Sequence, residues 1–559
     1  MVMHGPTSDD DDARIERSLR RLARRRFLQG GTALAGGAIL AGLPRPGSAI
    51  GAQAASRALT PKRGGTLVYA VDAVGENNDP GIFLTFGNWM AIDCICEGLT
   101  FFDYKSAASV PQPRLAERWE RSSDGRAYTF YLRKGVMFHD GTAFNAAAVK
   151  RNWVRLLDPK DPTRAPGTYA GSEIGGTNIK EVRTPDDHTV QLILNQPDQA
   201  QLLRLANPNG VVLSPAAIQK YGKDVGKHLV ATGPFKFDSM TSGQSVTMSA
   251  FDQYWGGRPY LDRFILKAIG DEATLTSSML SGETDATNFA PITAVKQFMA
   301  DPNLKVELGA PWIVLFLALN AKIGVTKNKL VRQAINYSID RRAIQSGVFG
   351  NTTILPAGMD TPASWAYDPA LQAESTQNIS KAKSLLAKAG FPNGVTVSMD
   401  VENTVFYPRL AESIQSSAAA AGVRIAVNKL DEGTFWGKVF AGKSQASLTQ
   451  RSGFVADPDN KLTPLLYSTS SVAQTETGND IYPNAKLFDH MLDVARAEPN
   501  KAKRRQLYFQ IQAWLLDMVP YVYLAYLRLP VVMQRYVMGV NAAALGTYRL
   551  YPHDIWLNK

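Results

Sequence analysis

From residue 312 to residue 520 the sequence alternates apolar runs of strand length with apolar stripes at helical spacing. The strand-like runs are Trp312–Leu319, 395–399 and 423–427. One helical stripe begins behind Asn328, a second begins at Ile379, a third covers roughly 407–421, and the last ends at Pro520. Strands that alternate with helices in this way predict a series of β/α units.

The residues before 312 have a different pattern. Tyr128, Phe130 and Leu132 alternate with polar neighbours, as do the apolar residues of 190–194, which predicts half-exposed strands. The run 65–70 predicts a buried first strand. A chain of 559 residues is also too long for one ordinary core. We therefore expect an α/β protein in the broad sense, with one mixed α+β part, one α/β part and a ligand site in the cleft between them.

The first 54 residues have the features of an export signal. Arg24-Arg25-x-Phe27-Leu28 precedes an apolar run from Gly30 to Leu43, and Ala52-Gln53-Ala54 offers the small residues that a signal peptidase reads. The paired arginines resemble a twin-arginine signal, although Ala23 stands where Ser or Thr is usual. The run of about 14 residues is shorter than a membrane-spanning helix requires. We expect residues 1–54 to be a cleaved twin-arginine signal peptide.

Charge and cysteine content narrow the location and the partners. Part of the net charge of +11 lies in the signal segment, and no basic run with interleaved aromatics follows residue 26, so we expect no nucleic-acid partner. The only cysteines are Cys94 and Cys96, and none follows the apolar run directly, which excludes a lipoprotein. On a helix these two side chains would diverge, so we interpret them as small buried residues. The expected location is the periplasm.

The common catalytic motifs are absent from the sequence. It contains no Gly-x-Ser-x-Gly, no His-Glu-x-x-His and no phosphate-binding glycine loop, and its six histidines are widely separated. Distant residues could still assemble a catalytic site. We nevertheless expect a protein that is not an enzyme, with no cofactor and no metal site.

Eight sequence blocks lie at 113–120, 128–136, 138–142, 232–235, 254–255, 281–285, 331–341 and 505–512. In this order and spacing they resemble the bacterial extracellular solute-binding proteins of family 5, the peptide- and nickel-type receptors of ABC importers. The resemblance covers roughly 62–555. The block Val331-Arg332-Gln333-Ala334-Ile335-Asn336-Tyr337-Ser338-Ile339-Asp340-Arg341 is especially typical of the family.

The resemblance implies a two-lobed fold of the periplasmic-binding-protein type, class II, with an extra subdomain in lobe I. Lobe I would comprise 62–317 and 521–559, with an insertion near 113–226, and lobe II would comprise 318–520. The lobes would close on a small molecule or a short peptide and deliver it to an ABC permease in the inner membrane. We expect a monomer. The ligand could be an oligopeptide, a sugar-derived or opine-like compound, or a chelated metal; an exported hydrolase is the remaining alternative.

The segment 451–460, RSGFVADPDN, lies where members of this family place a ligand-reading loop. In peptide-binding members an Asp a few residues before the Asp-Pro holds the peptide ammonium group, and Phe454 stands at that position here. We therefore expect Arg451 and Phe454 to contact the ligand, and a ligand with an anionic or hydroxyl-rich face becomes more plausible. Asp457 is either a third contact or the cap of the next helix.

Other residues predicted to contact the ligand come from three further stretches of the sequence. They are Asn88 and Trp89 before Glu97, Trp312 at the start of an apolar run, and Glu432, Phe435 and Trp436 after the strand 423–429. For Trp312 a role in the core is an equal alternative.

Overall fold

The computed structural model describes residues 60–559, apart from 83, 104–109, 169, 405, 453–456, 483–484 and 547. Its contacts divide the chain into Met1–Thr60 and Pro61–Lys559, and the sheets and helices named in this section all lie in the second unit. The predicted signal peptide lies outside the described residues, as does Phe454.

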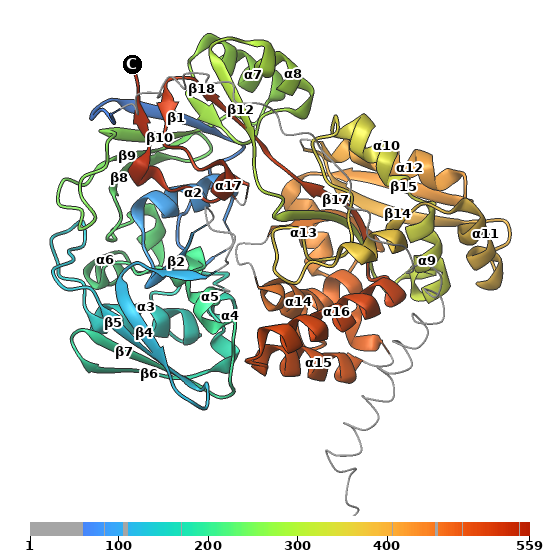
Figure 1. Ribbon diagram of the computed structural model, residues 1–559, viewed down its shortest axis with the longest axis horizontal. Coiled ribbons are helices and arrows are strands. Elements are labelled where there is room, and N and C mark those ends of the chain that lie inside the picture. The colour runs from blue at the N-terminus through green and yellow to red at the C-terminus, as the bar shows by residue number, and fades with distance from the viewer. Residues whose placement is uncertain are drawn as a thin grey trace, which may run out of the picture. The chain divides into compact units, whose positions relative to one another are not determined.

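A seven-stranded sheet is built from both ends of this unit (Figure 1). Its central strand β1 (Thr66–Val71) is parallel to both of its neighbours, β10 and β11, and the other pairs are antiparallel. In spatial order the strands are β12 (Leu304–Leu308), β18 (Pro530–Gln534), β11 (Ala286–Thr287), β1, β10 (Arg263–Ala268), β9 (Ser245–Ala250) and β8 (Phe235–Thr241). One core packs against β1, β9 and β10, and it includes residues from the C-terminal segment such as Leu550 and Leu557.

A five-stranded sheet contains the alternating elements of 312–520. Its order is β15 (Val423–Leu430), β14 (Val395–Glu402), β16 (Ala446–Arg451), β13 (Ile313–Leu319) and β17 (Tyr521–Leu527). Strand β14 is parallel to both of its neighbours, whereas β13 is antiparallel to β16 and β17. Every residue of β13 and β17 is buried, which explains why their sequences are apolar without alternation.

A four-stranded antiparallel sheet has a core of its own. Its order is β4 (Ala116–Arg121), β5 (Ala127–Leu132), β7 (Thr189–Leu194) and β6 (Ile179–Asp186). Tyr128, Phe130 and Leu132 of β5 are buried on one face, as their alternation predicts. Two short pairs complete the strands: β2 (Thr100–Phe102) with β3 (Pro111–Pro113), and β19 (Val537–Met538) with β20 (Trp556–Leu557).

The helices connect and cover these sheets. Before β13 they are α2 (Phe86–Ile95), α3 (Ala146–Leu157), α4 (Ala170–Glu173), α5 (Gln201–Leu205), α6 (Pro215–Tyr221), α7 (Glu272–Ser281) and α8 (Val295–Ala300). After it come α9 (Lys329–Ser338), α10 (Arg341–Ala343), α11 (Ile379–Lys388), α12 (Tyr407–Ala419), α13 (Glu432–Phe440), α14 (Pro458–Leu466), α15 (Ala485–Ala497), α16 (Lys501–Met518) and α17 (Ala542–Leu545). Helices α14, α15 and α16 pack as a group, drawn in orange to red in Figure 1.

The chain passes between the seven-stranded and five-stranded sheets twice, after β12 and after β17. Strands β13 and β17 belong to the five-stranded sheet, so the predicted boundaries at 317/318 and 520/521 would cut through β13 and detach β17 from its sheet. We therefore propose to draw lobe I as 61–308 and 530–559 and lobe II as 313–527. The extra subdomain predicted near 113–226 would then contain the four-stranded sheet, and it stays a proposal.

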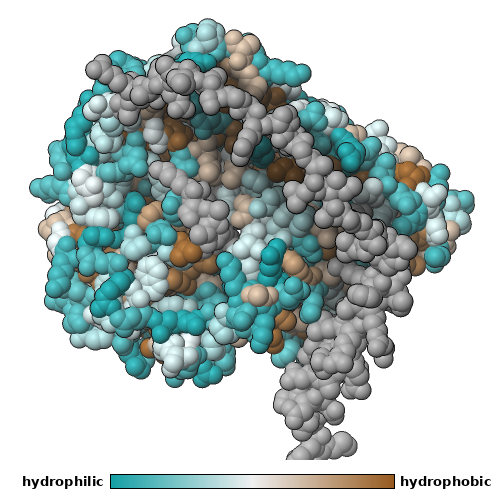
Figure 2. All heavy atoms as spheres, viewed as in Figure 1, coloured by the Kyte–Doolittle hydropathy of each residue, from teal (hydrophilic) through white to brown (hydrophobic). Residues whose placement is uncertain are grey.

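The local signals read from the sequence act as predicted. The Asn328 side chain accepts a hydrogen bond from the Leu330 amide at the start of α9. Asn378, which the sequence analysis did not single out, accepts from the Lys381 amide at the start of α11. Cys94 and Cys96 are buried and free. No helix among the described residues has the length and apolarity needed to cross a bilayer. On the face shown in Figure 2, hydrophilic residues predominate and apolar residues form small separate groups.

Candidate functional site

Two carboxylates stand at the carboxyl ends of central strands, one in each large sheet. Asp72 directly follows β1, and Glu402 is the last residue of β14. Both side chains are half-buried. The charge of Asp72 contributes to raising the pKa of Glu402, although the two groups belong to different sheets. The carboxyl ends of parallel strands are the usual edge for ligand binding in such sheets.

A third carboxylate, Glu432, begins α13 and is exposed. Burial first and the charge of Glu432 next raise the pKa of the Glu402 carboxyl to about 7. The pKa of Asp72 also rises to about 7, mainly through burial and then through Glu432, although the Ala73 amide donates to its carboxylate. No ion pair joins Asp72 or Glu402 to a described lysine or arginine. Burial and mutual repulsion therefore favour the protonated forms of Asp72 and Glu402, and a cation brought close to them would favour their ionised forms.

Three aromatic rings line the junction beside these carboxylates. Phe86 stacks on Tyr548 with 3.7 Å between ring centroids, and Phe289 stacks on the same Tyr548 ring at 5.5 Å. Phe86 is the first residue of α2, and Phe289 lies two residues after β11. Both rings pack against the cores of the two large sheets. Tyr548 has a left-handed backbone, with φ at 60°, which is uncommon for a bulky residue and indicates a position fixed by its surroundings. The rings form an apolar wall shared by the two lobes.

Arg451 and Trp436 lie on the lobe II side of the same region. Arg451 ends β16, and its Nη2 lies 3.1 Å from Oε2 of the buried Glu476. The guanidinium also lies over the Trp436 ring, 5.6 Å from its centroid, and Trp436 hydrogen-bonds Glu402. The Arg451 cation is thus paired within lobe II, and its predicted contact with a ligand stays a prediction.

Asp457 has the alternative role that the sequence allowed. It is the N-cap of α14, and its Oδ1 accepts from the Asp459 amide at 3.1 Å. Both of its oxygens also accept from Arg504, at 2.6 and 2.7 Å. The side chain is only 2% exposed. Because these bonds occupy both oxygens, Asp457 holds the helix in place, and its role toward a ligand stays a prediction.

Four other predicted residues are buried in packing or local hydrogen bonds. Asn88 is fully buried and accepts from the Gly75 amide at 2.7 Å, and Trp89 belongs to the core of lobe I. Trp312 packs edge-on against Phe102, with 6.1 Å between centroids, and Phe435 is fully buried in contact with Trp436. Their contact with a ligand stays a prediction.

Of the nine predicted residues, the structure brings Trp436 and Arg451 into contact, and Glu432 lies at the start of the helix that carries Trp436. The sequence analysis missed Asp72, Glu402 and the rings of Phe86, Phe289 and Tyr548. A signal for the two acids was available, since each ends or follows an apolar strand run. For the rings there was none, because their assembly depends on segments that are far apart in the sequence. Among the described residues, no group of three or more His, Cys, Asp and Glu side chains is arranged to hold a metal ion.

The sequence and the fold of this chain are both similar to those of known proteins. The model of the family described as bacterial extracellular solute-binding proteins, family 5, matches residues 110–472. Heme-binding protein A of Haemophilus influenzae is 30% identical over 444 residues, which cover 76% of this chain and 80% of that protein. The periplasmic binding protein DppA of Helicobacter pylori, solved with the peptide STSA, is 27% identical with a TM-score of 0.81, over 89% of this chain and 99% of that one.

The binding protein AgaA of A. tumefaciens R10, solved with agropinic acid, is equally similar in sequence. It is 27% identical with a TM-score of 0.79, and the match covers 89% of this chain and 99% of that one. The predicted two-lobed fold of the periplasmic-binding-protein type is confirmed by these similarities. The solutes named for these proteins differ in chemistry, so the ligand class has to be argued from the residues of this chain.

Proposed function

Because the chain belongs to the bacterial extracellular solute-binding proteins of family 5, we propose that it is the receptor of an ABC importer for peptides or peptide-like solutes. The solute is held between the lobes and passed to a permease in the inner membrane. Closure of two lobes on a bound solute couples occupancy to docking on the transporter. The protein acts as a receptor and not as an enzyme.

The observation that carries the ligand assignment is the group of carboxyls of Asp72, Glu402 and Glu432, in which burial and repulsion raise the pKa values of the first two to about 7. A cationic group of the solute, such as the α-ammonium group of a peptide, lies between these carboxylates. The wall of Phe86, Phe289 and Tyr548 contacts the apolar part of the solute. In this proposal the acids at the strand ends supply the amine contact that the position of Phe454 lacks.

A non-peptide solute is the second candidate. It is supported by the similarity to the agropinic acid-binding protein and by Arg451, a cation at the end of β16 that could pair with an acidic solute. In that case the Arg451–Glu476 pair would have to open, which costs more than binding at a free cation. We therefore propose peptides with a free amino group as the first candidate ligands.

Calorimetry and thermal shift with matched peptides test the assignment. Tri- and tetrapeptides with a free amino terminus should stabilise the mature protein by about 2.7 kcal/mol at a concentration a hundred times the Kd. Their N-acetylated forms should bind at least about ten times more weakly, because the ammonium–carboxylate contact is lost. Binding of opine-like acids with no response to any peptide would favour the second candidate. Turnover of a peptide without stable binding would favour a hydrolase.

We also propose export to the periplasm by the twin-arginine pathway, without lipid attachment and as a monomer. The paired Arg24 and Arg25 in the N-terminal segment support this route.

A further inference from the structure

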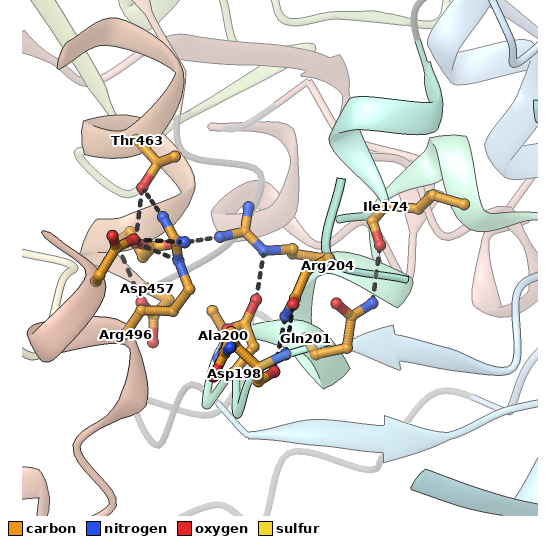
Figure 3. Close-up of polar contacts among 12 residues, drawn as sticks. Ile174, Asp198, Ala200, Gln201, Arg204, Asp457, Thr463 and Arg496 are labelled. Atoms are coloured by element: carbon orange, nitrogen blue, oxygen red, sulfur yellow. Dashed lines mark hydrogen bonds and ion pairs between the residues drawn. The ribbon is translucent and has the colours of Figure 1, made fainter. Parts of the chain in front are cut away.

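A second contact between the lobes lies at Asp459, in the first turn of α14. Asp459 is completely buried, and it is an ion-pair partner of two arginines. Arg496 of α15 places Nε 3.3 Å from both carboxylate oxygens, and Thr463 donates to Oδ1 at 2.7 Å. Arg204 reaches the carboxylate from α5, in lobe I, as Figure 3 shows with Arg204, Thr463 and Arg496 converging. One carboxylate thus joins a cation of its own lobe to a cation of the other.

Arg204 and Asp459 each have a second ion-pair partner within their own lobe. Arg204 lies 3.4 Å from Asp198, whose other oxygen accepts from the Ala200 amide at 2.7 Å. On the lobe II side, Arg496 also pairs with Asp493 at 3.1 Å. The charges therefore alternate along the array Asp198, Arg204, Asp459, Arg496 and Asp493. If the Arg204–Asp459 contact opened, both side chains would keep an opposite charge, so separation would leave no buried ion unpaired.

Backbone groups support the same junction. The Gln199 amide donates to the Arg496 carbonyl at 3.1 Å, and the Gln199 side chain donates to the Ala497 carbonyl at 3.2 Å. Another ion pair between the proposed lobes, Arg409 with Glu272, differs in character. Its atoms are 3.7 Å apart and its side chains are 40% and 39% exposed, whereas Arg204 and Asp459 are almost fully buried. Exposed pairs of this kind contribute little because water and salt screen them.

We infer that Arg204 and Asp459 form a reversible latch that holds the two lobes in contact at α5 and α14. The inference rests on the proposed receptor function, in which the lobes open to exchange solute. The buried contact favours the closed arrangement, because its attraction is strong only while water is excluded. The internal partners Asp198 and Arg496 make opening possible, because each charge remains paired in the open form. Arg204 and Asp459 are positioning residues and need not touch the solute.

Distance measurements between spin labels test the latch without any solute. Labels on Cys introduced at Lys180 of β6 and Lys503 of α16, both exposed, report the separation of the lobes in the mature protein. In the parent protein we expect mainly one distance. Arg204→Gln should move most of the population to longer distances. The matched control Arg496→Gln, which removes a partner of the same Asp459 inside lobe II, should leave the distribution centred as in the parent.

A folding check keeps the result interpretable. Circular dichroism and the melting temperature establish that each labelled variant is folded, and Asp459→Asn, which keeps the size of the side chain, provides a second way to weaken the contact. If Arg204→Gln and Asp459→Asn fold and both retain the parent distance, the latch is wrong. If both shift it while Arg496→Gln does not, the latch is supported. Peptide binding is measured separately, so loss of the receptor proposal would not be confused with loss of the latch.

Discussion

The carboxyl groups of two regions between the lobes, the contact at Asp459 and the strand ends at Asp72 and Glu402, differ in whether the chain pairs them with arginines. At the latch, Asp459 is buried between two arginines. At the strand ends, Asp72 and Glu402 are half-buried, share their space with Glu432, and have pKa values raised to about 7. A carboxylate that the chain neutralises holds the chain together. A carboxyl group whose ionised form the chain disfavours is available to a cation from outside, which would favour that form.

The largest effect is expected from removing the latch carboxylate. Asp459→Ala would remove the carboxylate between the buried Arg204 and the partly exposed Arg496 and leave Arg204 with Asp198 alone, at 3.4 Å. Breaking a buried ion pair from one side costs about 3–5 kcal/mol. Denaturant unfolding should show a loss of this order in the free energy of unfolding. A loss in the free energy of unfolding below about 1 kcal/mol would mean that the Asp459 carboxylate does not hold the chain together at this contact.

A change of opposite sign is expected at the strand end. Glu402→Gln removes a carboxylate whose pKa is raised from 4.5 to about 7 in the folded protein. Below pH 4.5 Glu402 is protonated in both states, so the variant and the parent should have similar stability. Between pH 4.5 and 7 the carboxyl ionises in the unfolded parent while it stays protonated in the folded parent, so the parent loses stability over this range and the variant does not. At pH 8 the variant should be more stable by about 1–2 kcal/mol.

The control for this experiment is Glu412→Gln. Glu412 lies on α12 and is exposed, and it pairs with Lys429 at 3.2 Å. Its replacement should leave the pH dependence of stability unchanged. In the binding assay, Glu402→Gln should weaken a peptide with a free amino terminus by about tenfold or more and its N-acetylated form far less. Stabilisation at pH 8 without this difference in binding would remove Glu402 from the ligand site.

Elements with strong local signals could be predicted from the sequence. Helix α9 begins behind Asn328 as its cap requires, and β14 and β15 lie where apolar runs of strand length predicted them. The boundaries of the lobes were harder to read, because β13 and β17 are uniformly apolar and nothing local indicates which sheet they join. Sheet membership depends on pairing with β16, which is far away in the sequence.

The candidate site shows the same limit. For Asp457, followed by Pro458, the sequence left a ligand contact and a helix cap as alternatives, and Asp457 is the N-cap of α14. The proximity of Asp72 to Glu402 and Glu432 could not be predicted, because these residues come from sequence positions more than three hundred residues apart and meet only when both sheets have formed. The same holds for Arg204 and Asp459, separated by 255 positions.

The smallest effect is expected at the exposed pair between the lobes. Arg409→Gln removes the contact with Glu272, whose atoms are 3.7 Å apart on side chains about 40% exposed. Such pairs contribute about 0–1 kcal/mol, so the free energy of unfolding should change by no more than this. The spin-label distances should also match those of the parent. A clear shift toward longer distances in Arg409→Gln would mean that an exposed ion pair also holds the lobes together. The claim that burial sets the Arg204–Asp459 contact apart would then be wrong.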